Sequence, residues 1–385
     1  MDDVIRDLPV GTLDSRAPEP AQTPAVSLID ATKHYGPVAA VDHVDLDIRA
    51  RELFTLLGPS GSGKTTILRI LAGLIELTSG ELLMGGEDVR SVPTFRRNIG
   101  LVFQSLALFP HMSVFDNIAF PLRMRRVGRE EISRKVKEAL DMVRLPDIGD
   151  RRIHELSGGQ QQRVAFARSL VYDPKLLLLD EPLGALDRRL REEMQLEIVR
   201  LHRDIDVTIV NVTHDQREAL MLSDRIGVMR NGRLEQVGRS EEIYSSPRRR
   251  FVAEFLGNAN MIDGEIVPDG NGLCLRTPGG VTFALPELPA AAEGRATVSL
   301  RAEALELLGP GDVAAAGSSV AGRVMLRVFE GEAVYYEVDV PSLGMVFKIS
   351  ASKRRAGSAI GDDVQMTWDP ADLTVIPDDG GSASG

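Results

Sequence analysis

The chain has 385 residues, of which 43% are hydrophobic and 26% are charged, and its formal net charge at pH 7 is −11. This length accommodates two or three domains with their own cores, and the acidic balance argues against a general nucleic-acid-binding protein, which needs a basic field to attract phosphates. The single cysteine, Cys274, excludes an internal disulfide or a Cys-x-x-Cys metal site, so it predicts a reducing compartment and a buried thiol.

The start of the chain carries no hydrophobic pattern. Residues 1–25 mix Pro, Ala, Asp and Thr without any period, which predicts a disordered N-terminal segment. The acidic beginning MDDVIRDLPV lacks the basic and apolar regions of a signal peptide, and the sequence contains no run of about 18 uninterrupted apolar residues. We therefore expect a cytosolic chain without a membrane-spanning segment.

From Val26 onward, short apolar runs alternate with helical patterns, which is typical of an α/β domain with a largely parallel sheet. Four runs are continuously apolar rather than alternating, and this predicts strands that are buried on both faces. The runs are LFTLL at 53–57, IGLVF at 99–103, KLLLLD at 175–180 and VTIVNVT at 207–213.

Two further segments have apolar residues at every third or fourth position, which predicts amphipathic helices. The first lies between the second and third apolar runs and predicts a helical subdomain at about 105–160. The second follows Asp187. The apolar positions are Ile132, Val136, Leu140 and Val143 in the first segment, and Leu190, Met194, Ile198 and Leu201 in the second.

The α/β domain, beginning at residue 26, is expected to end near Gly257. Shortly before that point, RIGVMRNGRLEQV predicts a β-hairpin in which Asn231 and Gly232 supply the two positive-φ residues of a type I′ turn. From 258 to 376, short β-prone pieces are separated by turn signals at intervals of roughly ten residues, which predicts a small all-β domain, either a barrel or a sandwich. The tail at 377–385 is predicted to be disordered.

The segment GPSGSGKTT at 58–66 fits the phosphate-loop pattern G-x-x-x-x-G-K-[ST] and lies between an apolar strand and a helical run, as such a loop requires. Gly61 and Gly63 allow backbone N–H groups to point at a phosphate. Lys64 is predicted to meet the β- and γ-phosphates of ATP, and Thr65 to bind Mg²⁺. The alternative is a glycine-rich turn with an incidental lysine. The predicted ATP-binding residues are Gly58, Pro59, Ser60, Gly61, Ser62, Gly63, Lys64, Thr65 and Thr66.

KLLLLDEP at 175–182 predicts a buried strand that ends in two adjacent carboxylates, and open α/β sheets bind ligands at the carboxyl ends of their strands. Asp180 is placed to hold Mg²⁺. Glu181 is placed to orient and deprotonate the water that attacks the γ-phosphate. The alternative is that both residues cap the following helix or face solvent.

Six motifs together resemble those of an ATP-binding cassette (ABC) ATPase in order and spacing. They are GPSGSGKTT, Gln104 after GLVF, LSGGQ at 156–160, LLLLDEP, ALD at 185–187 and His214 after VNVT. The resemblance covers about residues 28–257 and implies the α/β P-loop NTPase fold of that family. The later part resembles the TOBE-type, OB-like β domain of bacterial importer ATPases, and RLEQVG, EEIYSSP and RFVAEFLGNANMIDGEI resemble its polyamine-importer branch.

In that family two nucleotide domains pair head to tail, so that each ATP lies between the phosphate loop of one chain and the LSGGQ stretch of the other. Ser157 can cap a helix whose first N–H groups face outward and would hold the γ-phosphate of the partner's ATP. The alternative is a plain helix N-terminus, and Val164, Ala167 and Leu170 in the later half are expected to face the core. The resemblance thus implies a homodimer with the ATP-binding residues Ser157, Gly158, Gly159 and Gln160.

The resemblance also implies roles for four single residues. Gln104 would bind Mg²⁺ and the attacking water, and His214 would contact the γ-phosphate; for both, the alternative is a structural polar residue at a strand end. Asp187 would cross the dimer interface near the opposite phosphate loop, which is compatible with capping the next helix. Tyr35 would stack on adenine, although a tyrosine near a strand end also packs against a core. The candidate catalytic residues are therefore Glu181, His214, Gln104 and Lys64.

The resemblance further implies an importer ATPase that is peripherally attached to the cytoplasmic face of the inner membrane. Its partners would be two integral membrane permease subunits and, indirectly, an extracytoplasmic solute-binding protein; no nucleic acid is expected. The segment SLALFPHMSVFDNIAFPL at 105–122, with a loop at 106–112, is the expected contact with a short permease helix. Its apolar residues can equally fill the helical subdomain. They are Leu106, Leu108, Phe109, Phe115 and Phe120.

Other functions stay open at this point. A polyamine, spermidine or putrescine, is the favoured solute by resemblance alone, and ferric iron, a sugar or another small solute are the alternatives. A soluble ABC ATPase acting on ribosomes or DNA usually carries two cassettes in one chain or a long coiled coil, and a non-hydrolysing binder would lack Glu181 or His214. Two positions depart from the family pattern. Gly184 replaces a serine that many relatives have, although glycine is also usual in the polyamine-importer branch, and Ala302 replaces a typical proline, which weakens the case for a ligand or regulatory role of that loop.

Overall fold

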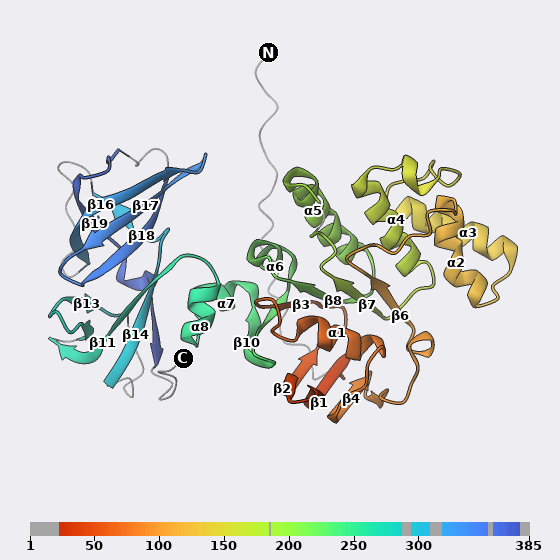
Figure 1. Ribbon diagram of the computed structural model, residues 1–385, viewed down its shortest axis with the longest axis horizontal. Helices are drawn as coiled ribbons and strands as arrows, with labels where there is room; N and C mark the ends of the chain where they lie inside the picture. The colour runs from red at the N-terminus through yellow and green to blue at the C-terminus, as the bar shows by residue number, and fades with distance from the viewer. Residues whose placement is uncertain are drawn as a thin grey trace, which may run out of the picture.

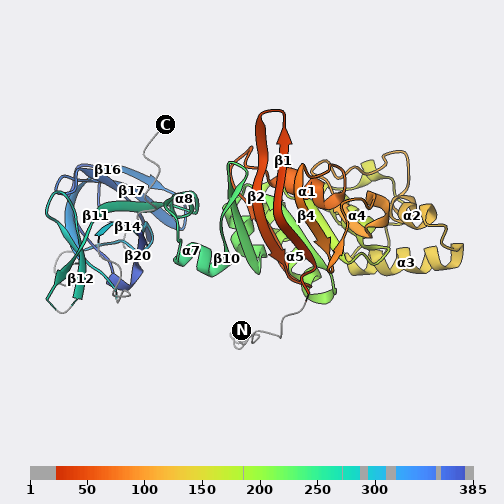
Figure 2. The same cartoon turned by 90° about the horizontal axis from the view of Figure 1, so that it is seen from below.

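The computed structural model describes residues 23–184, 186–270, 272–286, 294–308, 318–352 and 357–377. An α/β part and an all-β part lie beside each other along the long axis of the molecule (Figure 1, Figure 2), and two short helices, α7 (Ser240–Ser245) and α8 (Arg250–Phe255), join them. The segments predicted to be disordered, 1–25 and 377–385, fall outside the described residues except for 23–25 and 377.

A six-stranded sheet with the order β10-β9-β3-β8-β7-β6 forms the centre of the α/β part. The four continuously apolar runs form four of its parallel strands, as predicted, and β9 also pairs in parallel with β3. Every residue of β3 and β8 is buried, which explains their uninterrupted hydrophobicity. The predicted hairpin is also present, with Asn231 at φ 49° and Gly232 at φ 82°. The strands are β3 (Leu53–Leu57), β6 (Ile99–Val102), β7 (Leu176–Asp180), β8 (Thr208–Thr213), β9 (Arg225–Arg230) and β10 (Arg233–Arg239).

A second, antiparallel sheet with the order β2-β1-β4-β5 was not predicted. From Val41 to Ile48, buried residues in β2 are separated by exposed or half-buried ones, and the short apolar run VAAV at 38–41 is largely unburied, so β2 lacks the pattern that marks the central strands. Helix α1 (Lys64–Ala72) lies between the two sheets, because its Ile67 and Leu71 share one core with Leu28 of β1 and Val210 of β8. The strands are β1 (Val26–Tyr35), β2 (Val38–Ile48), β4 (Ser79–Met84) and β5 (Glu87–Asp88).

Helices α2 (Val114–Met124), α3 (Arg129–Met142) and α4 (Gly158–Leu170) pack against one another at the end of the α/β part that is farthest from the β part (Figure 1). A short 3₁₀ turn at Ile153–Glu155 lies between α3 and α4, and another at Thr94–Arg96 precedes β6. The predicted apolar faces are confirmed in α3 and in α5 (Arg188–Asp204), except that Leu190 of α5 is only half-buried. The buried members are Ile132, Val136, Leu140, Val143, Met194, Ile198 and Leu201.

The all-β part contains two five-stranded sheets that share one core, which agrees with the predicted barrel or sandwich. Phe283 and Trp368 stack in this core with ring centroids 5.1 Å apart, and Cys274 is buried, as predicted. A 3₁₀ turn at Pro370–Asp372 precedes the last strand. The first sheet holds β11 (Ala259–Asp269), β12 (Gly272–Arg276), β13 (Thr282–Ala284), β14 (Gly294–Arg301) and β20 (Leu373–Pro377); the second holds β15 (Glu306–Leu307), β16 (Ser319–Phe329), β17 (Ala333–Val340), β18 (Met345–Ser352) and β19 (Asp363–Thr367).

Hydrogen bonds from both parts converge on the junction that follows α8. Gln216, the first residue of α6 (Gln216–Leu222), accepts a hydrogen bond from the backbone N–H of Gly257 at 3.0 Å. From the β part, the Arg301 guanidinium donates to the carbonyl of Leu256 and to that of Tyr244, the latter at 2.8 Å, and lies 4.3 Å from the centroid of the Tyr244 ring. The two parts are therefore held by specific bonds rather than by a free linker.

Ala302, at the position where the resembled family typically has proline, contributes to the same junction. Its backbone N–H donates to the carbonyl of Asn258 at 2.8 Å. Proline has no N–H, so this bond exists only because the residue is not proline.

Candidate active site

The phosphate loop connects β3 to α1 through residues 58–63, as the sequence pattern predicts. Gly61 and Gly63 have φ values of 79° and 104°, a region that side chains with a Cβ rarely adopt. Packing adds a second constraint, since a Cβ on Gly63 would lie 2.3 Å from the carbonyl oxygen of Ala40. In the rest of the loop, Pro59 and Ser60 are exposed, Gly58 and Ser62 are buried, and Thr65 and Thr66 are half-buried.

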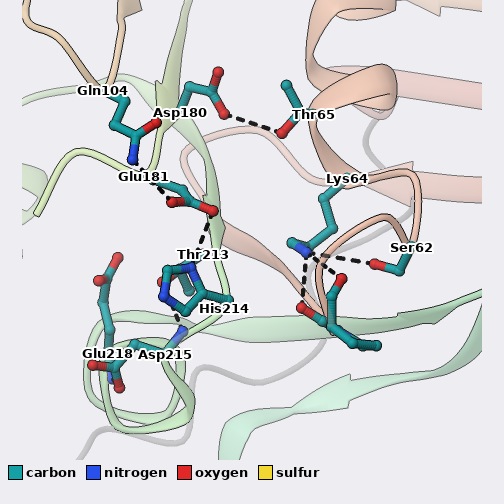
Figure 3. Close-up of polar contacts among 12 residues, drawn as sticks. Ser62, Lys64, Thr65, Gln104, Asp180, Glu181, Thr213, His214, Asp215 and Glu218 are labelled. Carbon is teal, nitrogen blue, oxygen red and sulfur yellow. Dashed lines mark hydrogen bonds and ion pairs between the residues drawn. The ribbon is translucent and has the colours of Figure 1, made fainter. Parts of the chain in front are cut away.

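Lys64 lies inside this loop with only 5% of its surface exposed. Its ammonium group donates hydrogen bonds to the carbonyls of Gly58 and Pro59, both at 2.8 Å (Figure 3). Burial lowers the pKa of Lys64, and the negative charges of Glu181 and Asp180 oppose this shift. The loop therefore presents a buried cation that faces the two carboxylates at the end of β7.

Asp180 ends β7 and Glu181 directly follows it, where the sequence places them. The Thr65 hydroxyl donates to Asp180 Oδ1 at 3.4 Å, and burial raises the pKa of the Asp180 carboxyl. Neither carboxylate caps the following helix α5, because that cap is Asp187, whose side chain accepts from the N–H of Leu190. The alternative role of Asp180 and Glu181 as caps is therefore wrong.

Glu181 is held between Gln104 and His214 (Figure 3). Its Oε2 accepts from Gln104 Nε2 at 3.4 Å, and its Oε1 lies 3.1 Å from His214 Nδ1. The backbone of Glu181 has φ 47°, a left-handed conformation that costs a non-glycine residue about 1–3 kcal/mol. The N–H of Glu181 donates to the carbonyl of Val212 at 2.9 Å, which ties this conformation to β8. Three side chains from neighbouring strand ends thus converge at one place.

Oxygen ligands that suit Mg²⁺ lie at the same place. A hydroxyl from Thr65, a carboxylate from Asp180 and an amide oxygen from Gln104 match the preference of this ion for hard donors. Among the described residues no group of three or more His, Cys, Asp or Glu side chains could hold a metal ion. The donor set fits an ion that takes only one carboxylate and fills its other positions with phosphate oxygens and water.

Glu218 is a residue of this region that sequence reasoning missed. It is 3% exposed, and its Oε1 accepts from Asn211 Nδ2 at 3.0 Å. With Glu181 and His214 it lines a cavity of about 50 Å³. Burial raises the pKa of Glu218 to about 7. Glu218 lies three residues after Asp215, the cap of α6, and this spacing is typical of a capping box. The sequence therefore predicts an exposed capping residue rather than a buried carboxyl.

Changing Glu218 to Gln is expected to alter how stability depends on pH. With its pKa raised from 4.5 to about 7, the folded protein binds more protons than the unfolded chain between these values, so Glu218 makes the fold less stable as pH rises through that window. Between pH 5 and pH 8, the free energy of unfolding of Glu218→Gln should therefore rise relative to the parent by about 2–3 kcal/mol. Urea denaturation at both pH values measures this, with the exposed Glu193→Gln as control. An identical difference at pH 5 and pH 8 would contradict the prediction.

The LSGGQ stretch begins α4, and Ser157 is its cap. The Ser157 hydroxyl accepts from the N–H of Gln160 at 3.4 Å, and the Gln160 side chain accepts from the N–H of Ser157 at 3.0 Å. Ser157 and Gly158 are exposed, whereas Val164, Ala167 and Leu170 in the later half are buried, as predicted. Within the described part of the chain, residues 157–160 form no hydrogen bond or ion pair with the phosphate loop.

Within the described residues, the contacts of Asp187 and Tyr35 are with neighbours in the sequence. The Asp187 side chain caps α5 by accepting from the N–H of Leu190. Tyr35 ends β1 with half of its surface exposed, and Lys33 Nζ lies 5.4 Å from its ring centroid. Tyr35 is therefore not a core residue, which is the alternative that its position at a strand end left open.

The segment 105–122 starts as a loop, as expected for residues 106–112, and enters α2 at Val114. The Arg168 guanidinium holds this loop by donating to the carbonyls of Leu106 and Ala107, both at 2.7 Å. The five apolar residues of this segment are neither fully buried in the core nor fully exposed to solvent. Each is half-buried: Leu106, Leu108, Phe109, Phe115 and Phe120.

Comparison with known proteins gives matches in both parts of the chain. The family model described as ABC transporter matches residues 41–184, and the model described as TOBE domain matches residues 298–376. The spermidine/putrescine import ATP-binding protein PotA of Pseudomonas aeruginosa (strain UCBPP-PA14) is 45% identical over 352 residues, which make up 90% of this chain and 96% of that protein. The protein of the same name from Rubrobacter xylanophilus is 44% identical over 365 residues, covering 94% and 96% of the two chains.

Solved structures of similar fold cover just over half of this chain. One is cbiO1 from Clostridium perfringens, described as part of an ABC transporter complex, with a TM-score of 0.54 and 28% identity over 57% of this chain and 90% of that one. Another is the dimeric structure of MJ0796, described as a bacterial ABC transporter cassette, with a TM-score of 0.50 and 33% identity over 56% of this chain and 98% of that one.

Proposed function

This chain belongs to the family of ABC transporter ATP-binding proteins, and we propose that it hydrolyses ATP to drive the import of a polyamine, spermidine or putrescine. The observation that carries the hydrolytic part is the position of Glu181 between Gln104 and His214, opposite the buried Lys64. An arrangement of a phosphate loop, a strand-end carboxylate pair and a water-positioning group is what phosphoryl transfer to water requires.

In the proposed mechanism Glu181 accepts the proton of the attacking water. Gln104 and His214 hold the Glu181 carboxylate from both sides, so it is oriented before the substrate arrives. Lys64 and the loop N–H groups around Gly61 and Gly63 bind the phosphates of ATP. His214 contacts the γ-phosphate and keeps the water in line.

Thr65, Asp180 and Gln104 would hold Mg²⁺. When bound there, the ion neutralises charge on the β- and γ-phosphates and fixes their orientation. The half-buried Asp180 supplies its carboxylate next to the Thr65 hydroxyl, 3.4 Å away.

We propose that the site is completed by a second copy of the chain. Ser157, Gly158, Gly159 and Gln160 would meet the γ-phosphate of the partner's ATP, and Asp187 would cross the interface. The exposure of Ser157 and Gly158 at the start of α4 supports this, as does the similarity to a cassette that was solved as a dimer. Tyr35, half-exposed at the end of β1, would stack on the adenine.

The permease contact is assigned to the segment 105–122. No helix among the described residues is long and apolar enough to cross a membrane. We propose that the chain binds two integral membrane subunits on the cytoplasmic face of the inner membrane, and that the half-buried apolar residues of this segment receive a permease helix. An extracytoplasmic solute-binding protein would deliver the solute.

The polyamine rests on the names of the relatives, and ferric iron, a sugar or another small solute are the alternatives. A soluble ABC ATPase outside transport is the alternative from another class. The test is uptake of radiolabelled spermidine, ferric iron and maltose by cells that lack the gene.

We expect the deletion strain to lose spermidine uptake and to keep iron and maltose uptake. A plasmid copy of the parent should restore spermidine uptake, and Glu181→Gln should not. If the deletion strain lost only iron uptake or only maltose uptake, that solute would take the place of the polyamine in the proposal. Unchanged uptake of all three would contradict the polyamine, iron and maltose assignments together.

A further inference from the structure

Arg191, in the first turn of α5, connects two segments of the proposed site. Its Nη2 donates to the backbone carbonyl of Leu186 at 3.0 Å. Its Nη1 lies 3.6 Å from Asp215 Oδ2, forming an ion pair. Leu186 directly precedes Asp187, the residue assigned to the dimer interface, and Asp215 directly follows His214. One guanidinium therefore joins the interface segment to the neighbour of His214.

The Asp215 end of this connection is rigid. Asp215 Oδ1 caps α6 by accepting from the N–H groups of Arg217 at 2.9 Å and Glu218 at 3.1 Å. The N–H of Asp215 donates to the Thr213 hydroxyl at 3.0 Å. Because Oδ1 is used by the helix, Oδ2 is the oxygen left to pair with Arg191. A displacement of Arg191 is consequently passed to the backbone that carries His214.

Arg191 lies beside the residues that are proposed to take part in hydrolysis. Arg191 lines the cavity of about 50 Å³ together with Glu181, His214, Asp215 and Glu218. Its Nε is buried and has no hydrogen-bond partner within the described residues. A guanidinium can bond a carbonyl and a carboxylate at the same time through separate N–H groups, which the single ammonium of a lysine does less well.

We propose that Arg191 is a positioning residue that couples the Leu186–Asp187 segment to His214. The inference rests on the proposed function, because it needs the head-to-tail dimer to engage Asp187. When two chains close on ATP, the Leu186–Asp187 segment is fixed by the partner. Arg191 then fixes Asp215 and, through it, the position of His214 relative to Glu181. Hydrolysis is thereby tied to a closed interface.

The first test compares Arg191→Ala with Arg189→Ala. Arg189 lies on the same helix, is 91% exposed and, among the residues that the structure describes, pairs with Glu193, so it controls for loss of an arginine from α5. For Arg191→Ala we expect kcat to fall by roughly 100-fold, the size of effect that a small misplacement of a reacting group produces, with KM for ATP unchanged. Arg189→Ala should keep both constants. Arg191→Lys should recover little, because it keeps the charge but not the paired N–H groups.

The second test uses Asp215→Asn, which keeps a side chain able to cap α6 but removes the charge that Arg191 contacts. We expect the same fall in kcat, and no further fall in the double variant with Arg191→Ala, because both changes break one connection. In the Glu181→Gln background, Arg191→Ala should still form a dimer with MgATP on gel filtration.

The proposal is overturned if Arg191→Ala lowers kcat no more than Arg189→Ala, or if the two effects at 191 and 215 add. A loss of ATP affinity or of dimer formation that accounts for the lower rate would also overturn it, by giving Arg191 a structural role. Any of these outcomes would leave the proposed function as an importer ATPase unaffected. If the parent chain hydrolysed ATP as a monomer, both the proposed two-chain site and the proposed role of Arg191 would be contradicted.

Discussion

Replacing Glu181 with glutamine is expected to lower ATP hydrolysis by about 10²- to 10⁴-fold while ATP binding is retained. The new amide would keep the shape of the side chain and an oxygen to accept from Gln104 or His214, but it cannot take the proton of the attacking water. The left-handed backbone at φ 47° is equally tolerable for glutamate and glutamine, so the folded structure should not change. Steady-state phosphate release measures the effect.

The same variant should accumulate a dimer, because ATP that is not hydrolysed keeps both chains together. Gel filtration with MgATP should show a species of twice the chain mass for Glu181→Gln and little of it with ADP. Glu193→Gln is the matched control, since this exposed glutamate of α5 pairs with the exposed Arg189 of the same helix, and its replacement should leave the rate at the parental value. A parental rate in Glu181→Gln would show that another group is the base.

Replacing Ser157 with arginine is expected to block hydrolysis by about 100-fold or more without preventing ATP binding to the phosphate loop. Ser157 is exposed at the start of α4, and its hydrogen bonds are to Gln160 rather than to the loop of its own chain. An arginine there would place bulk and charge where the partner's γ-phosphate is held. Ser157→Ala is the control, because it removes the cap of α4 without adding bulk, at a cost of about 1 kcal/mol in the free energy of unfolding.

Mixing two inactive chains tests whether this site is shared. A mixed dimer of Ser157→Arg and Lys64→Ala chains contains one site with an intact phosphate loop and an intact LSGGQ stretch. ATP hydrolysis should therefore reappear on mixing, although each variant alone is inactive. Ser157→Arg should bind a fluorescent ATP analogue as the parent does. Loss of that binding, or no activity on mixing, would contradict a site built from two chains.

The core of the fold was predictable because the strands of the central sheet are buried on both faces. LFTLL and VTIVNVT contain no exposed positions, so they stand out without any structural context. The antiparallel sheet was missed for the opposite reason. In β2, exposed and half-buried residues such as Asp42 and Asp47 separate the buried ones, and only the packing of α1 between the two sheets makes those strands part of a core.

The candidate site was predictable where a residue follows a strand. Gln104, Glu181 and His214 each follow an apolar run, and parallel pairing brings such positions to one edge. Glu218 and Arg191 escaped because their sequence signals point elsewhere, one to a helix cap and the other to a run of surface charges on α5. The roles of Ser157 and Asp187 depend on a second chain and stay predictions.

The junction after α8 determines where this chain can be divided. Domain boundaries normally fall in exposed linkers that few contacts cross. Here a fragment that stops at Gly257 would lose Arg301, and with it the donors to the carbonyls of Leu256 and Tyr244 at the end of the α/β part. A fragment that begins at Asn258 would lose those acceptors. The boundary predicted near Gly257 falls within this junction, and neither fragment would keep the hydrogen bonds across it that the full chain has.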